Sequence, residues 1–304
     1  MFNIIGKRFW FFTISGALVL VCAIALAVFG LKPGIEFSSG SLLTIRFEQT
    51  VDIGDLRAKL SDIGYSGAII QTTSSGDFQI RTTTLTDDTK ESLKQALTDQ
   101  FGPNTESGFT SIESTVSRQT LRTVIIAVAV SALGIVIYIT FAFRKMPNPV
   151  RYGACGIVAM IFDVTMVIGI FALLARLFDW EVNLMFITGL LAVIGYSIND
   201  KIVIFDRIRE NTRRLSGVDF ATTVNRSLVE TLSRSLITSV STIFAVIALM
   251  LFVGSTISNF LVALLIGIIA GSYSSVAVAA PLLVVWQNNE WRRFLPWLKK
   301  PAGP

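Results

Sequence analysis

The sequence predicts an α-helical integral membrane protein with six transmembrane helices and one small α+β domain outside the membrane. Its 304 residues are 52% hydrophobic and only 15% charged, whereas about a quarter of the residues of a soluble domain carry charge. A helix needs about 20 apolar residues to cross the hydrocarbon core of a bilayer. Six segments meet this length, namely residues 10–30, 121–142, 154–177, 183–204, 236–254 and 259–285.

The first apolar segment is expected to be a retained span, grouped with the N-terminus as residues 1–30. Lys7 and Arg8 precede it, as basic residues precede the core of a secretory signal peptide. However, its apolar run exceeds the roughly 7–15 residues of a signal core, and no small-residue cleavage site is clear after it.

The distribution of Lys and Arg predicts the orientation of the chain. Basic residues cluster in residues 1–9, 143–151, 207–235 and 286–304, which all fall on one side of the six spans. Because basic loops stay in the cytoplasm, both termini are expected there. Residues 31–120 then lie outside with 8 Lys and Arg against 12 Asp and Glu, while the remaining chain holds 18 against 9. This topology explains the pI near 9.4, so nucleic acid is not an expected partner.

Residues 31–120 are expected to form the small α+β domain, with the ferredoxin-like element order βαββαβ. Stretches rich in β-branched and aromatic residues predict its strands, and apolar residues at helical spacing predict its helices. Thr86 is placed to cap the second helix, and Asp87 and Asp88 fall favourably in the first turn. The expected strands are 42–47, 67–73, 77–83 and 109–117, and the expected helices are 52–63 and 87–101.

Residues 121–285 are expected to form a five-helix transmembrane bundle, interrupted by a basic amphipathic segment at 207–235. Apolar residues recur there at three- and four-residue steps, from Val218 through Val224 to Leu232. A helix lying at the cytoplasmic interface explains this pattern, and whether it also docks a partner is left open. Residues 286–304 form a basic tail whose Trp and Arg residues are typical of an interfacial anchor.

The fourth span places Asn199, Asp200 and Lys201 well inside its apolar run. A charged side chain at mid-membrane costs roughly 2.5–3.5 kcal/mol, and such residues tend to mark proton or ion pathways. A coupling role is therefore expected for Asp200. Lys201 has two interpretations: it can neutralise a buried carboxylate, or its long stem can carry the ammonium to the cytoplasmic headgroups. The second interpretation is favoured.

Asp163 of the third span is expected at a depth comparable with that of Asp200, because a short loop joins the two spans. Two carboxylates in a low dielectric can share one proton, since ionising both is costly. Helical spacing puts Tyr196, Asp200 and Arg207 on one face of the fourth span. Asp206 and Arg207 lie near its cytoplasmic exit and are expected to be interface charges rather than direct transport residues.

Small residues in the sixth span predict close helix packing. Gly267 and Gly271 stand four residues apart, followed by Ser274 and Ser275, and small residues at this spacing let membrane helices approach closely. Helix contacts are the expected role of each residue taken singly.

The residue types present exclude the usual catalytic and metal sites. The sequence has no His, and its two Cys, Cys22 and Cys155, both fall in predicted spans. No phosphate-binding GxxxxGK[ST] run and no Ser/His/Asp set is present. No enzyme activity, metal or cofactor is therefore expected, and energy has to come from an ion gradient or from a partner.

Four stretches, in register from about residue 6 to residue 285, carry a resemblance to a known family. The first opens with Gly195, Tyr196 and Ser197 and runs through Asn-Asp to Asp-Arg-Ile-Arg-Glu-Asn; another lies after the first span, as Gly34-Ile-Glu-Phe37-Ser-Ser-Gly40. The other two are residues 225–234 and residues 271–275 with 279–283. Together they resemble the SecF proteins of the SecD/SecF family, within the resistance-nodulation-division superfamily.

The resemblance implies an auxiliary subunit of the bacterial Sec protein-export machinery, located in the cytoplasmic (inner) membrane with residues 31–120 in the periplasm. The partners it implies are SecD, the SecYEG channel, the SecA ATPase indirectly, and the translocating preprotein. It further implies that the proton-motive force is coupled to late preprotein translocation. The coupling candidates in this chain are Asp163, Asn199, Asp200, Lys201, Asp206 and Arg207, and the choice between protons and Na⁺ is left open.

Three positions depart from the pattern of the family. Phe162-Asp163 stands in the third span where the family often has His-Asp. Lys201 follows Asn-Asp where the family usually has a small or hydroxylic residue. Ser39-Gly40 ends the loop after the first span where a Gly-Gly pair is usual.

Two other functions remain open. The chain can be half of a small-molecule or lipid exporter of the same superfamily, although its single short outside domain and the Asn-Asp to Asp-Arg run argue against this. It can also be a scaffold that steadies the export channel, in which case the intramembrane charges serve helix packing with SecD.

Overall fold

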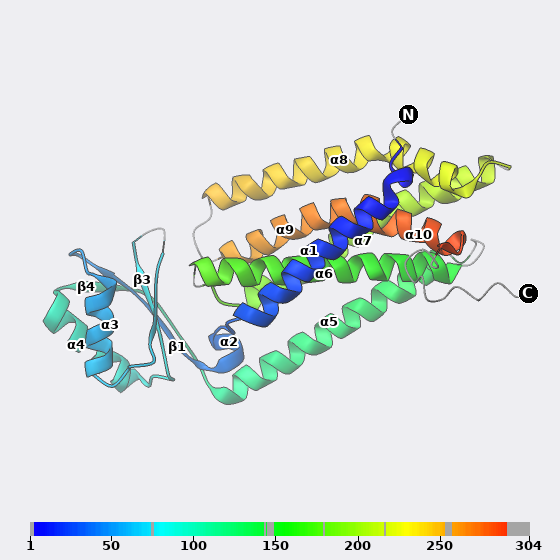
Figure 1. Cartoon of the computed structure of the whole chain (residues 1–304). Helices are drawn as coiled ribbons and strands as arrows, with labels where there is room; N and C mark the ends of the chain where they lie inside the picture. Colours follow the sequence, from blue (N-terminus) through cyan, green and yellow to red (C-terminus); the bar gives the residue numbers. More distant parts are fainter. Residues whose placement is uncertain are drawn as a thin grey trace, which may run out of the picture.

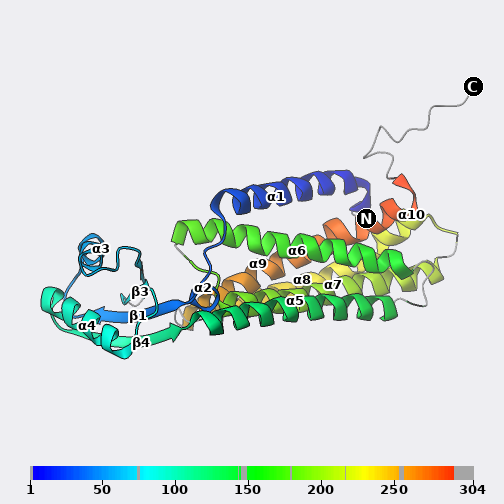
Figure 2. The same ribbon diagram turned by 90° about the horizontal axis from the view of Figure 1, so that it is seen from below.

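The computed structural model describes residues 3–73, 76–142, 144, 149–178, 180–215, 217–252 and 257–290. Within these residues, a small sheet region projects from one end of a bundle of long helices (Figures 1 and 2). The short helix η1 (Ile5–Lys7) and helix α10 (Ala280–Gln287) lie at the other end. We call these two ends of the bundle the sheet end and the far end.

The sheet region, residues 40–112, has the predicted element order β-α-β-β-α-β. Its elements are β1 (Gly40–Phe47), α3 (Ile53–Asp62), β2 (Ile69–Thr72), β3 (Phe78–Thr82), α4 (Asp87–Phe101) and β4 (Asn104–Ile112). All neighbouring strands are antiparallel, in the spatial order β2-β3-β1-β4. The expected end of the last strand is wrong, because β4 ends at Ile112 and residues 114–117 begin a helix. Its burial does not alternate cleanly, so the sequence pattern marked its bounds poorly.

The core of the sheet region forms where the two helices cover one face of the sheet. Leu43, Ile45 and Ile80 of the strands are fully buried, and the apolar residues of both helices pack against them: Leu56, Leu60, Leu93 and Leu97. The predicted cap of α4 is confirmed, since the Thr86 side chain accepts a hydrogen bond from Thr89 N in a capping box.

The bundle contains six helical stretches that are long and apolar enough to cross a membrane, among the residues the structure describes. Each overlaps one predicted span. They are η1 with α1 (Arg8–Phe29), α5 (Ser114–Ala142), α6 (Pro149–Phe178), α7 (Leu184–Arg214), α8 (Phe220–Phe252), and α9 (Ser258–Ser274) continued by the π-helical turn η3 (Ser275–Ala279) and α10. A helix of 30 residues is about 45 Å long, so these helices exceed the ~30 Å hydrocarbon core.

Helices α6, α7 and α9 form the centre of the bundle, whereas α1, α5 and α8 expose most of their apolar side chains. Glycines set the closest approach of α7 and α9. A Cβ added at Gly267 would lie 2.0 Å from Val193 Cγ2, and one added at Gly271 would lie 3.0 Å from Ser197 Oγ. The prediction of close packing at these small residues is therefore confirmed.

The segment 207–235 is not the separate interfacial helix that we expected. Its first part continues α7 to Arg214, and its second part belongs to α8, which begins at Phe220. Val224 and Leu228 are fully buried in the same apolar cluster as Phe205. The apolar stripe therefore packs against the bundle, which the pattern alone could not distinguish from packing against a membrane surface. Most of the predicted tail, residues 291–304, lies outside the described residues.

Candidate functional site

A buried ion pair lies midway along the two central helices α6 and α7. Lys201 Nζ is 2.6 Å from Asp163 Oδ2, and both side chains are only 1% exposed. Lys201 Nζ also donates to Ser197 Oγ and lies 3.4 Å from Ser197 O. The favoured expectation that Lys201 reaches the headgroups is wrong. The Lys201 side chain instead turns into the bundle, because Asp163 of α6 and Ser197, one turn earlier on α7, supply hydrogen-bond acceptors for its ammonium there.

Asp163 is held through only one of its two carboxylate oxygens. Oδ2 accepts hydrogen bonds from Lys201 Nζ and Ser197 Oγ. Oδ1 is buried and has no hydrogen-bond partner among the described residues. A buried polar atom in this condition is uncommon and needs an explanation.

Asp200 lies at a comparable position on α7 but faces different partners. Its Oδ1 accepts a hydrogen bond of 2.7 Å from Ser235 Oγ of α8, and its Oδ2 lies 3.3 Å from Ser275 Oγ. Ser275 is the first residue of the π-helical turn η3, and single π turns in helices often occur at functional sites. Asp163 and Asp200 thus sit at one level of the bundle, each with its own set of partners. We call these residues the buried charge cluster: Asp163, Ser197, Asp200, Lys201, Ser235 and Ser275.

One face of α7 is directed at α8 over several turns, as the helical spacing predicts. Tyr196 Oη lies 3.5 Å from Ser239 Oγ, Asp200 binds Ser235, and Arg207 Nε donates to Glu230 Oε2 at 2.7 Å. The hydroxyls continue toward α9, since Ser239 Oγ and Ser272 Oγ are 2.6 Å apart. Polar contacts therefore link α7, α8 and α9 from the middle of the bundle toward the far end.

Of the six coupling candidates, Asn199, Asp206 and Arg207 lie outside the buried charge cluster. Asn199 and Gly195 are exposed on the outer face of α7. Asp206 is exposed and forms an ion pair of 2.6 Å with Arg209. Asn199 points away from the cluster although Asp200 directly follows it, because successive residues of an α-helix point about 100° apart.

The loop after α1 ties the sheet region to the bundle. Gly34 N donates to Val182 O at 2.7 Å, Val182 N donates to Lys32 O at 2.8 Å, and Phe37 packs on the apolar cluster around Phe171. Gly40 has a φ of +125°, and an added Cβ would lie 2.5 Å from Thr82 O. Glycine is therefore required at residue 40. Ser39, the residue before it, has a φ of +61°, which is costly for any residue but glycine.

At the far end, Asn225 of the signature stretch 225–234 binds the N-terminal segment. Asn225 Oδ1 of α8 accepts hydrogen bonds from Ile4 N and Ile5 N at 2.8 and 3.1 Å. Arg8 forms a bidentate ion pair with Glu290, with contacts of 2.7 to 3.0 Å. These contacts fix η1 and the start of α1 against α8 and the end of α10.

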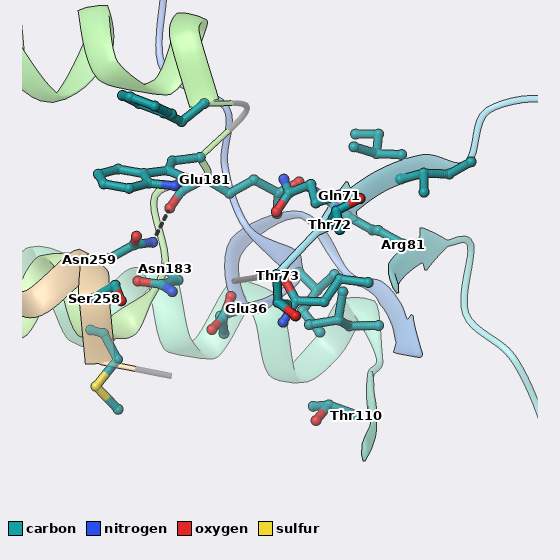
Figure 3. Close-up of a pocket in the computed structure, with 18 of the residues that line it drawn as sticks. Glu36, Gln71, Thr72, Thr73, Arg81, Thr110, Glu181, Asn183, Ser258 and Asn259 are labelled. Carbon is teal, nitrogen blue, oxygen red and sulfur yellow. Dashed lines mark hydrogen bonds and ion pairs between the residues drawn. The ribbon is translucent and has the colours of Figure 1, made fainter. Parts of the chain in front are cut away.

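A pocket of about 720 Å³ lies at the sheet end, between the sheet region and the ends of α6, α7 and α9 (Figure 3). Arg81 of β3 reaches Glu181 across it at 2.6 Å, and Asn259 donates to Glu181 O at 2.9 Å. Burial raises the pKa of the Glu181 carboxyl, although Arg81 acts in the opposite direction. The Arg81–Glu181 contact is an ion pair without hydrogen-bond geometry, since Glu181 Oε1 lacks a hydrogen-bond partner among the described residues.

Sequence reasoning found both buried carboxylates but missed the hydroxyls that bind them. The motif that contains Ser197 and the small-residue spacing at Ser275 give no sign of these contacts. Ser235 and Ser275 lie 35 and 75 residues from Asp200 along the chain, so no local pattern could reveal them. The described residues contain no group of three or more His, Cys, Asp or Glu placed to hold a metal ion.

Comparison with known proteins identifies a family for this arrangement. The family model described as "Protein export membrane protein SecD/SecF, C-terminal" matches residues 89–289. A second, described as "SecD/SecF GG Motif", matches residues 24–51.

Similar proteins cover the full length of the chain. The protein translocase subunit SecF of Anaerolinea thermophila is 40% identical over 100% of this chain and 99% of its own length. That of Thermobaculum terrenum is 42% identical over 96% of each chain. Among solved structures, SecDF from Thermus thermophilus, titled a translocon-associated membrane protein, matches with a TM-score of 0.85 at 31% identity. This match covers 94% of the present chain, which spans 39% of that longer chain.

Proposed function

Because the chain belongs to the SecD/SecF family of protein-export membrane proteins, we propose that it acts in Sec-pathway export. In this proposal it works with SecD to couple the proton-motive force to late preprotein translocation across the bacterial cytoplasmic membrane. Support for a SecD partner comes from the similar Thermus thermophilus protein, in which the matching region is 39% of a chain named SecDF. The SecYEG channel, SecA indirectly, and the preprotein complete the proposed set of partners.

One observation carries the coupling proposal: two carboxylates lie buried in the middle of the bundle, and their hydrogen-bond partners among the described residues are hydroxyl and ammonium groups. Burying an ionisable group in a membrane is costly, and such groups tend to serve proton or ion transfer. One charge that crosses ~180 mV releases about 4 kcal/mol. This free energy is enough to shift a two-state equilibrium by about a thousandfold.

Asp200 is the proposed proton acceptor. When it is ionised, it accepts hydrogen bonds from Ser235 of α8 and Ser275 of η3. Protonation removes the charge that attracts both hydroxyls and so weakens the link among three helices. Asp163 with Lys201 supplies a fixed charge pair beside it. Asp206 and Arg207 act in this proposal near the cytoplasmic exit, where Arg207 joins α7 to α8 through Glu230.

The sheet region is proposed to be a ferredoxin-like periplasmic domain that carries the motion outward. Support comes from its βαββαβ order and antiparallel sheet β2-β3-β1-β4. Its connection to α7 through Val182 and Glu181 offers a mechanical path from the cluster, because both residues immediately precede that helix. We further propose domain limits of 1–30, 31–120, 121–285 and 286–304, with both termini cytoplasmic and no ATPase activity in this subunit.

A scaffold role is the alternative that a specific observation favours. The Asp163–Lys201 pair is a closed contact at 2.6 Å, and a closed ion pair can serve packing without any ion transfer. Under this alternative, the charges steady the contact of this chain with SecD and no proton crosses.

Replacement of Asp200 by Asn tests the proposal. Proton flux and preprotein export are measured in membrane vesicles that carry this chain with its SecD partner and the export channel. We expect flux to fall roughly 100-fold, as when a positioned proton acceptor is removed, while the complex with SecD purifies intact. Asp99→Asn, at an exposed site of the sheet region where Gln95 Nε2 donates to it, is the matched control. Unchanged proton flux and export in Asp200→Asn would rule out the coupling role of Asp200. Loss of the complex with SecD would favour the scaffold role.

A further inference from the structure

Arg81 of β3 binds two separate connections of the chain at the sheet end of the bundle. Its guanidinium donates to Pro33 O at 2.9 Å and to the Ser38 hydroxyl, both in the segment after α1. It also lies 2.6 Å from the carboxylate of Glu181, shortly before α7. We propose that Arg81 is a positioning residue that transmits movement of α7 to the sheet region, so that its loss uncouples proton flow from preprotein export. This inference rests on the function proposed above.

The shape of the guanidinium suits these three acceptors. Arginine presents five N–H donors in a rigid planar fork, whereas a lysine ammonium is a compact point charge. The side chains of Arg81 and Glu181 are each only 15% exposed, so their attraction is screened less than that of a pair in open water. Arg81 therefore fixes the relative positions of β3, the segment after α1 and the connection before α7.

The two connections that Arg81 binds are also bound to each other and to α9. Gly34 N donates to Val182 O and Val182 N donates to Lys32 O, at 2.7 and 2.8 Å. Asn259 Nδ2, near the start of α9, donates to Glu181 O at 2.9 Å. Because Glu181 and Val182 come shortly before α7, a shift or tilt of that helix displaces the carboxylate that Arg81 binds.

The other end of the contact lies on an inner strand of the sheet. β3 pairs with β1 and β2, with Arg81 opposite Leu42 on one side and Ile69 on the other. Successive residues of a strand point to opposite faces, and the neighbouring Ile80 is fully buried in the core of the sheet region. A close-packed core transmits strain, so a pull on Arg81 moves the sheet region as one body.

The pocket beside Arg81 leaves this transmission to the contacts that span it. It encloses about 720 Å³ between the sheet and the ends of α6, α7 and α9 (Figure 3). Where this space separates the two parts, side-chain packing passes on no displacement, because dispersion attraction requires atoms within about 4 Å of each other. The Arg81–Glu181 pair reaches across the pocket and joins its two walls.

The test measures proton flux and preprotein export separately, in membrane vesicles that carry the full-length chain with its SecD partner and the export channel. Arg81→Leu keeps an apolar side chain but removes all three contacts. We expect export driven by an imposed proton gradient to fall about 10-fold, within the usual range of coupling between two sites, while proton flux stays within about twofold. Arg46→Leu removes an arginine that pairs with Asp77 inside the sheet region. It is the matched control and should leave both quantities unchanged.

Two further variants distinguish transmission from a general loss of structure. Arg81→Lys keeps a positive charge without the planar fork and should restore part of the export. Glu181→Gln removes the ion pair but leaves the bonds of Arg81 to Pro33 and Ser38, so its loss of export should be smaller than that of Arg81→Leu. Adding Glu181→Gln to Arg81→Leu should lower export no further, because both changes act through one contact.

Three results would contradict the inference. The first is unchanged export in a folded Arg81→Leu variant. The second is a parallel loss of flux and export, because Arg81 would then support the bundle itself. The third is unchanged export in folded Glu181→Gln, which also decides the matter if Arg81→Leu does not fold.

The unmodified chain separates this inference from the proposed function. If its export does not respond to the proton gradient, the proposed function itself fails. If its export responds and the Arg81→Leu variant exports equally well, only the role of Arg81 is overturned.

Discussion

The sheet region buries apolar side chains and exposes charged ones, whereas the middle of the helix bundle buries a charged pair and exposes apolar side chains. In the sheet region Leu43, Ile45 and Ile80 are buried, while the Lys94–Glu106 pair lies at the surface with each side chain about a quarter exposed. In the bundle, large apolar residues such as Phe244 face outward, and Lys201 with Asp163 lies inside at 1% exposure. The polar surface of the sheet region is suited to water, and the apolar surface of the bundle is suited to lipid.

This contrast identifies which charges require a functional explanation. A surface pair such as Lys94–Glu106 contributes little to stability, because water and salt screen it. A buried ion pair has to recover a large desolvation cost. Apolar residues of similar volume in its place often leave the protein equally stable or more stable. The presence of charge in the centre of the bundle is therefore not explained by stability. Three measurements sharpen the comparison, starting from the largest expected effect.

Removing the carboxylate of the buried pair should have the largest effect. Asp163→Ala leaves the Lys201 ammonium buried without its counter-ion, and we expect it to lower the free energy of unfolding by about 3–5 kcal/mol. Glu106→Ala breaks a surface pair and should cost less than about 1 kcal/mol. Denaturant unfolding of both variants in detergent measures the difference. Equal losses of unfolding free energy in the two variants would mean that the buried ion pair and the surface ion pair contribute equally to stability.

Filling the contact between α7 and α9 should have an intermediate effect. Gly267→Ala puts a methyl group where Val193 already lies, at 2.0 Å, and overpacking of this kind typically costs about 1–3 kcal/mol. Gly134→Ala on α5 is the matched control, because nothing lies within 4 Å of its added Cβ. It should be neutral or stabilising by up to about 1 kcal/mol, given the helix propensity of Ala. A tolerated Gly267→Ala, read from Tm, would contradict the close approach of these helices.

A change at the junction of the two regions should be the smallest and should stabilise. Ser39 has a φ of +61° directly before Gly40, and glycine adopts this conformation without steric cost. Ser39→Gly is therefore expected to raise the free energy of unfolding by about 1 kcal/mol. The same substitution in a helix, Ser92→Gly in α4, should lower it by about 0.5–1 kcal/mol. Effects of the same sign in thermal unfolding would refute the strain at residue 39.

The sequence alone determined most of the architecture of this chain. Six apolar runs of span length and the alternation of strand and helix patterns in the sheet region both have physical causes that act locally, namely lipid solvation and side-chain periodicity. The same reasoning located Asp163 and Asp200 as buried charges and placed Tyr196, Asp200 and Arg207 on one face of α7. Each of these conclusions depends only on residues near one another along the chain.

Only the tertiary structure decided which partners those charges meet. Helical periodicity fixes which side chains share a face, but not which helix that face contacts or how closely. The glycines of α9 let α7 approach, and the rotation of α7 then directs Lys201 to Asp163 and Asp200 to Ser235, while Asn199 is left outside. The π-helical turn at Ser275 adds a contact that no pattern predicted. These pairings join residues 35 to 75 positions apart, and packing of whole helices, not local propensity, determines them.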